Sequence, residues 1–167
     1  MEQQEGTNTS REIKDITRRL REHHAGDPWY GKSTRELLKG VDESIVFEQP
    51  AGGHSILQLL WHMIVWREFV YCSFVPQEGK DVKYFDTNDW PPVDHADKSL
   101  WQKGLVYYEE LHGLMMEAIE KQNDSVLEQT VPGRKYNYRY LLEGIGEHDV
   151  YHLGQIAILN KMLRAEK

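Results

Sequence analysis

The sequence predicts an all-α protein, a bundle of four long helices. Four segments carry apolar residues in steps of three and four, which is the spacing of one helix face. Residue patterns typical of helix N-termini open these segments, whereas signals for β-strands are weak. Together the two observations place the chain among helical bundles.

Length and composition fit one domain. The chain has 167 residues, of which 40% are apolar and 28% charged, enough for a sizeable single core. We expect residues 1–9 to be a disordered polar tail and residues 10–165 to form the domain. The single cysteine, Cys72, allows no disulfide within the chain, which favours a cytoplasmic location. No apolar run approaches the roughly 18 residues of a membrane span, so no membrane association is expected.

The charge balance bears on the partners. A net charge of -7 argues against nucleic-acid binding, which normally needs a basic surplus or a basic face. The one basic cluster, Arg18, Arg19 and Arg21, suits the exposed face and last turn of a helix, where cations complement the helix dipole. Nucleic acid is therefore not an expected partner.

The first long helix is predicted at residues 10–24. Thr9 followed by Glu12 has the capping-box pattern, and the Gly-Asp-Pro at 26–28 ends the helix. Its inward face should carry Ile13, Ile16 and Leu20. A short helical piece is expected at 33–39, where Ser33 and Glu36 repeat the capping pattern.

The second long helix is predicted at residues 55–74, with Ser55 and Gln58 as its capping box and Pro76 after its end. Residues 76–93 are then expected to form a long connection rich in aromatic residues and proline. A connection of this length is often a lid or a binding loop, and a surface loop pinned by its aromatic side chains is the alternative.

The third and fourth long helices are predicted at residues 97–121 and 137–163, the fourth with Asn137 as its N-cap. The inward stripe of the third is Trp101, Leu105, Tyr108, His112, Met115 and Ile119. The inward stripe of the fourth is Leu141, Ile145, His148, His152, Ile156, Leu159 and Leu163. The long connection allows the second and third helices to run parallel, so up-down-down-up and up-down-up-down topologies both remain open at this point.

Two histidines lie within the stripe of the fourth helix. His148 and His152 are four residues apart, which places them one above the other on a helix, about 6 Å apart, so that they can share one metal ion. Imidazole ligands suit borderline divalent metals such as zinc, nickel or copper. A third ligand is needed, and His62 is the first candidate because it shares an inward helix face with apolar residues. His112 is the second candidate.

The alternative to a metal is a set of core histidines satisfied by ordinary hydrogen bonds. Three buried imidazoles without partners would cost several kcal/mol, and a shared ion satisfies all three. A zinc-protease site is disfavoured, since Asp149 stands where that class has glutamate. Glu147 and Asp149 are instead candidates for carboxylates that orient a ligand histidine, or for solvated acids of the helix surface.

The remaining histidines have simpler interpretations. His23 and His24 end the first helix, where they complement its dipole. His54 precedes a helix cap and His95 lies in a loop, so both are expected to be exposed.

Four stretches resemble the DinB/YfiT-like superfamily in order along residues 10 to 165. The two most specific are HSILQLLWHMIVW at 54–66 and HDVYHLGQIAIL at 148–159. PWYGKSTRELLKGV at 28–41 and VPGRKYNYRYLL at 131–142 are the others. The resemblance implies an up-down-down-up four-helix bundle that binds one divalent metal through His62, His148 and His152. Relatives often have Trp-His-Gly where this chain has Trp29, Tyr30 and Gly31, so the part that these residues play here is open.

The resemblance also implies candidate activities. Some members look like transferases or isomerases that use a low-molecular-weight thiol such as bacillithiol or mycothiol, and others like metal-dependent hydrolases. We expect a metal, zinc or nickel, that activates such a thiol for attack on an electrophilic small molecule. A hydrolase and a non-catalytic metal- or ligand-binding stress-response protein are the alternatives. A homodimer is also implied. Trp29, Tyr30, Trp61 and Trp66 are candidate walls of an aromatic pocket, although core packing also explains Trp61 and Trp66.

Overall fold

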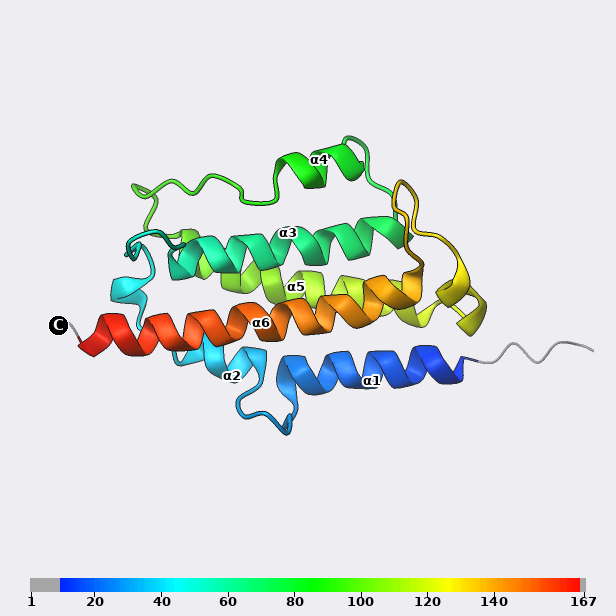
Figure 1. The fold of residues 1–167 in the computed structure, drawn as a ribbon, viewed down its shortest axis with the longest axis horizontal. Helices are drawn as coiled ribbons and strands as arrows, with labels where there is room; N and C mark the ends of the chain where they lie inside the picture. Colours follow the sequence, from blue (N-terminus) through cyan, green and yellow to red (C-terminus); the bar gives the residue numbers. More distant parts are fainter. Residues whose placement is uncertain (1–9, 166–167) are drawn as a thin grey trace, which may run out of the picture.

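The computed structural model describes residues 10–165, and every regular element in that range is a helix (Figure 1). The four long helices are α1 (Arg11–Ala25), α3 (Ile56–Phe74), α5 (Leu100–Glu120) and α6 (Tyr138–Ala165). The short ones are α2 (Thr34–Lys39), α4 (Val82–Thr87) and the 3-10 helices η1 (Glu43–Ile45) and η2 (Asp124–Glu128). The all-helical class is thus confirmed. The tail predicted at residues 1–9 lies outside the described residues.

Local capping sets the start of three predicted helices. The Ser55 side chain accepts from the backbone N–H of Gln58, and the Gln58 side chain accepts from the backbone N–H of Ser55, so the predicted capping box is present. The Asn137 side chain likewise accepts from the Tyr140 N–H at the start of α6. Ser33 caps α2 by accepting from the N–H of Glu36.

The start of α1 is satisfied by a distant residue. The Asp124 carboxylate, in η2, accepts from the backbone N–H groups of Glu12 and Ile13 at 3.1 and 2.9 Å. Two of the N–H groups that a helix N-terminus leaves unpaired are thereby satisfied. Thr9, predicted to cap this helix, lies outside the described residues.

The connection after α3 is not the continuous loop that the sequence suggested. Residues 82–87 form α4, whose N-cap Asp81 accepts from the N–H of Tyr84. Its one buried side chain, Phe85, packs edge-on against Phe69 of α3 at a ring separation of 5.3 Å. A helix of six residues is too short to display an apolar period, so the pattern that reveals the long helices misses it.

The four long helices lie alongside one another, with α4 outside α3 (Figure 1). After α4 the chain passes back along the outside of α3, so that α5 begins at the same end of the molecule as α3. α3 packs mainly on α5 and α6, and α1 packs on the other side of these two helices. At the contact of α3 with α5, a Cβ on Gly104 would lie 2.9 Å from Leu60 Cδ2, so glycine permits the close approach.

The buried apolar side chains form two clusters, one towards each end of the bundle. One contains Val65, Phe69, Met115, Leu142 and Ile145, and the other Leu60, Ile64, Leu111, Leu153 and Ile156. Near the sequence positions where one cluster gives way to the other, the three central helices carry buried polar residues: His62, Arg67, His112, Asp149 and His152. The functional chemistry must be sought in this polar layer, because burial of polar groups is costly unless they are partnered.

None of the helices within residues 10–165 is both long enough and apolar enough to cross a lipid bilayer.

Candidate metal centre

His62 enters the polar layer from α3, a helix buried on most of its surface. Its ring is 5% exposed, and its Nδ1 lies 2.7 Å from the backbone carbonyl oxygen of Asp89. A carbonyl can only accept, so Nδ1 carries the proton and donates it. The lone pair of Nε2 is therefore free on the opposite side of the ring.

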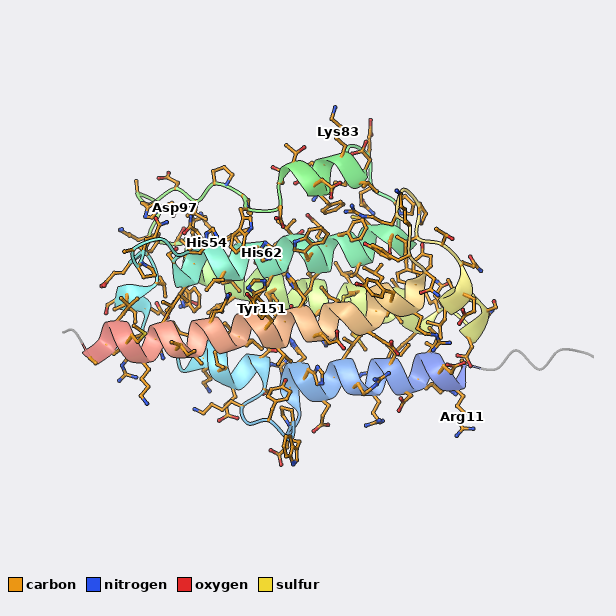
Figure 2. All side chains as sticks on the ribbon, viewed as in Figure 1. Arg11, His54, His62, Lys83, Asp97 and Tyr151 are labelled. Atoms are coloured by element: carbon orange, nitrogen blue, oxygen red, sulfur yellow. The ribbon has the colours of Figure 1, made fainter. Side chains whose placement is uncertain are left out.

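His148 and His152 face His62 from α6, as their helical spacing predicted. Their ring centroids are 4.5 Å apart, and those of His152 and His62 are 4.6 Å apart. Nδ1 of His152 donates to the side-chain oxygen of Gln155 at 2.7 Å, which again leaves Nε2 unprotonated. Figure 2 labels His62 on α3 and Tyr151, the neighbour of His152, on α6.

The three histidines converge closely enough to share an ion. One ligand atom from each lies within 4.8 Å of those of the other two, and Nε2 of His62 lies 3.0 Å from Nε2 of His148. Two nitrogen ligands at about 2.1 Å from one ion are separated by roughly 3.0 to 3.4 Å. Among the described residues, no other group of histidine, cysteine and acidic side chains has this geometry.

Without a cation, His148 has no satisfactory tautomer as a neutral ring. A proton on Nε2 can be donated to His62, but the bare Nδ1 then faces Oδ1 of Asp149 at 3.8 Å. A proton on Nδ1 faces Asp149 favourably, but Nε2 of His148 is then unprotonated. Its lone pair faces the lone pair of His62 Nε2 at 3.0 Å, and the two repel each other. Nδ1 of His148 and Oδ1 of Asp149 are both buried and lack a hydrogen-bond partner. A cation between the Nε2 atoms removes the conflict, so the residues fit a divalent metal.

The surroundings favour the neutral form of two of these imidazoles. Burial lowers the pKa of His62, and the hydrogen bond to Asp89 only partly opposes this effect. Burial also lowers the pKa of His152, to about 4. Because a metal ligand must be the neutral imidazole, the fold prepares both rings for coordination near neutral pH.

The connection between α4 and α5 forms one wall of the site. Trp90 stacks on His62 at a centroid separation of 3.9 Å and on His54 at 3.6 Å. Its neighbour Asp89 accepts from Trp66 Nε1 at 2.7 Å and from Nδ1 of His62 through its carbonyl. The parts of Asp89 and Trp90 were not expected from the sequence, in which their only signal was an acid and an aromatic residue inside a long connection.

A hollow of about 620 Å³ opens beside His148. Its wall is mostly aromatic and aliphatic: Trp66, Tyr136, Tyr140, Leu141, Ile145 and Tyr151, with Glu143, Gly144 and Glu147. Of the aromatic residues singled out from the sequence, Trp66 lies in this wall. Glu147 is exposed and lines the hollow, whereas Asp149 is buried beneath His148.

The other aromatic residues that the sequence offered as pocket walls do not line this hollow. Trp29 is fully exposed and lines a separate hollow with Asp27 and Lys32. Tyr30 packs edge-on against His23, at a centroid separation of 5.6 Å, and contacts none of the three histidines. Trp61 is half-buried, and its Nε1 is buried without a partner.

His112 is buried, as expected, but it is not part of the trio. Its Nδ1 accepts from Arg67 at 2.7 Å, and its ring stacks on His24 at 3.6 Å. His24, expected only to complement the end of α1, is 2% exposed, and its Nε2 lies 3.1 Å from Glu109. These contacts make His112 a satisfied core histidine, and they could not be read from either helix alone.

Comparison with known proteins adds the family. The family model described as the DinB superfamily matches residues 31–156, a range that holds all three converging histidines. Neither a curated protein nor a solved structure matches the chain. The matched range covers most of the described helices, and so the chain belongs to the DinB superfamily.

Proposed function

We propose that this protein is a metal-dependent enzyme whose single divalent ion, zinc or nickel, is held by Nε2 of His62, His148 and His152. The observation that carries the proposal is the unresolved tautomer of His148, which a cation between the Nε2 atoms resolves. The Nδ1–H donors of His62 and His152 support it, because their acceptors fix the ring orientations that ligation requires.

Three protein ligands are typical of a catalytic rather than a structural site. No fourth histidine, cysteine or acidic residue joins the group in the described part of the chain, so an exchangeable ligand can complete the coordination. Such an ion, when bound, would hold a thiol as its thiolate, the nucleophilic form, near neutral pH. We therefore propose transfer of a low-molecular-weight thiol to an electrophilic small molecule.

The hollow beside His148 is the proposed site of the electrophile. Its aromatic and aliphatic wall suits an apolar substrate body, with Trp66 and Tyr151 as contact surfaces next to the histidines. Trp90, in the connection between α4 and α5, stacks on His62 and keeps bulk water from one face of the His62 ring.

One observation favours hydrolysis as the second candidate. Glu147 lines the same hollow as His148, where an exposed carboxylate can accept a proton from an attacking water. Asp149 cannot take this part, because it is buried and committed to Arg67. If neither activity is found, the protein is a non-catalytic metal- or ligand-binding protein.

We further propose that residues 10–165 form one up-down-down-up domain in the cytoplasm that binds no nucleic acid. The course of the chain in Figure 1 supports this topology. A homodimer is proposed through the outer face of α6. There Tyr151, Ile158 and Met162 are 64%, 61% and 55% exposed, a patch that a second copy of the chain would cover. Sedimentation of Ile158→Glu beside the unaltered protein tests this contact.

Turnover tests the function. Untagged protein loaded with zinc or nickel is mixed with monobromobimane and, in turn, bacillithiol, mycothiol, cysteine and glutathione. We expect the metal-loaded protein to accelerate bimane conjugation with at least one thiol, and His148→Ala to abolish the acceleration. Hydrolysis of p-nitrophenyl acetate, lost in Glu147→Gln, would instead favour the hydrolase. A metal-loaded protein inactive in both assays would contradict the enzyme proposal and leave the binding protein.

A further inference from the structure

A fully buried ion pair lies next to the proposed ligands. Arg67 of α3 and Asp149 of α6 are each 1% exposed, and both lie on helices whose neighbouring buried residues form the apolar core. Nη2 and Nε of Arg67 donate to the same oxygen, Oδ2 of Asp149, at 2.6 and 2.8 Å. A buried pair of this kind adds little stability compared with apolar side chains of similar volume. Its presence beside His148 therefore calls for a function other than stability.

The pair leaves one carboxylate oxygen for His148. Oδ2 of Asp149 also accepts from the Tyr108 hydroxyl at 3.1 Å, so three donors converge on this oxygen. Oδ1 receives none and lies 3.8 Å from Nδ1 of His148, which itself has no partner. Holding Oδ2 in place turns Oδ1 towards the histidine.

The sequence spacing does not produce this arrangement. Adjacent side chains on a helix diverge, so His148 and Asp149 would not normally face each other. The contact needs a carboxylate that is held from outside α6. Arg67 supplies this restraint from α3 through Oδ2, the carboxylate oxygen that does not face His148.

Arg67 is itself fixed on two further sides. Its Nη1 donates to Nδ1 of His112 at 2.7 Å, and its guanidinium carbon lies 4.5 Å from the centroid of the Tyr108 ring. Beyond His112, the His24 ring stacks at 3.6 Å and contacts Glu109, which binds Arg35. Two residues of α5 thus hold the guanidinium in one position, with His24 of α1 packed behind His112, and the guanidinium in turn fixes the position of Asp149.

We propose that Arg67 is a positioning residue for the metal centre: it orients Asp149 so that Oδ1 faces His148 Nδ1, ready to accept its hydrogen bond when a metal binds Nε2 of His148 on the His62 side. The inference rests on the proposed function, since it assigns Arg67 an effect on metal binding. It also explains why two inward histidines, His24 and His112, are kept in the core without being ligands.

The test compares zinc affinities in a double-mutant cycle. Arg67→Met removes the donors with a similar volume, Asp149→Asn removes the carboxylate charge, and the third variant combines them. Zinc affinity is measured by competition with a chromophoric chelator on untagged, metal-stripped protein. We expect each single variant to bind zinc about 10- to 100-fold more weakly than the unaltered protein, the range of loss when a ligand's orienting partner is removed. The double variant should be no weaker than Asp149→Asn.

Two further variants keep the test informative if Arg67→Met does not fold. Arg67→Lys retains the charge with a single donor group and should recover part of the affinity lost in Arg67→Met, or lose less than Asp149→Asn. Tyr108→Phe removes one hydrogen bond to Oδ2 but leaves Arg67 in place, so its zinc affinity should stay within about threefold. Thermal unfolding of each metal-free variant reports its stability separately.

A role in stability alone would lower the melting temperature of the metal-free Arg67 variants and leave zinc affinity unchanged, which would overturn the inference. Affinity losses that add in the double variant would also overturn it, because Arg67 would then act independently of Asp149. If the unaltered protein binds no zinc, the proposed function itself fails. If it binds zinc and folded Arg67 variants bind it equally well, only the inference about Arg67 fails.

Discussion

Acidification should destabilise the metal-free protein at pH values above those at which carboxylates titrate. Burial lowers the pKa of His112 to about 2, with the Arg67 charge adding to the effect, and burial lowers the pKa of His152 to about 4. Burial also lowers the pKa values of His24 and His62. All four histidines are therefore harder to protonate in the folded chain than in the unfolded chain, whose histidine pKa values lie near 6.5. His112 and His152 stay neutral in the folded chain between pH 6 and pH 5.

The sign and size of this change in the free energy of unfolding follow from proton linkage. Between pH 6 and pH 5 the unfolded chain binds nearly one proton more than the folded chain at His112, and likewise at His152. Each residue then lowers the free energy of unfolding by about 1.2 kcal/mol, or roughly 2.5 kcal/mol for the two. This stability is fully present above about pH 6.5 and is lost as the pH falls towards the folded-state values.

The assay is urea unfolding of metal-stripped protein at pH 7, 6 and 5, followed by circular dichroism. The matched control is His112→Asn, whose side-chain oxygen can still accept from Arg67 but cannot be protonated in this range. Its loss of stability from pH 6 to pH 5 should be smaller than that of the unaltered protein by about 1.2 kcal/mol. Equal pH dependence in the two proteins would refute the conclusion that His112 is held neutral by its surroundings.

Two other predictions follow from packing. Gly104→Ala should have a free energy of unfolding about 1 to 3 kcal/mol below that of the control Gly113→Ala in urea titrations, because its Cβ would lie 2.9 Å from Leu60 Cδ2. Gly113→Ala, in the same helix with nothing within 4 Å of its Cβ, should be neutral or stabilising by up to about 1 kcal/mol, and a loss equal to that of Gly104→Ala would contradict the close-approach argument. Trp90→Ala should weaken zinc binding less than His62→Ala in the chelator competition, since Trp90 only stacks on the ligand ring; unchanged affinity would show that this wall does not support the site.

Periodicity and capping patterns predicted what depends on local sequence. The stripes located the four long helices, and the patterns at Ser55 and Asn137 placed two of their starts. The spacing of His148 and His152, together with the inward face that carries His62, led to the group that converges in space. These features repeat every turn of a helix, so a linear sequence displays them.

What the sequence could not show depends on contacts between distant segments. Asp124 satisfies the start of α1 from more than a hundred residues away, and Asp89 supplies the acceptor for His62 from a connection with no period of its own. Arg67 looked like an interruption of an apolar helix until Asp149 and His112 were placed beside it. The partners of buried polar groups are a property of the tertiary structure, and so they escape local reasoning.

Histidine side-chain NMR can show whether Nε2 of His62, His148 and His152 together bind one divalent ion, as proposed. Long-range proton–nitrogen spectra of metal-free protein should show His62 and His152 protonated on Nδ1, as their acceptors require. On addition of one equivalent of zinc, the Nε2 resonances of the three histidines should shift together and then stop changing, while those of His54, His95 and His112 stay in place. Unchanged Nε2 resonances in the trio, or zinc-induced shifts at His112 in their stead, would contradict the claim.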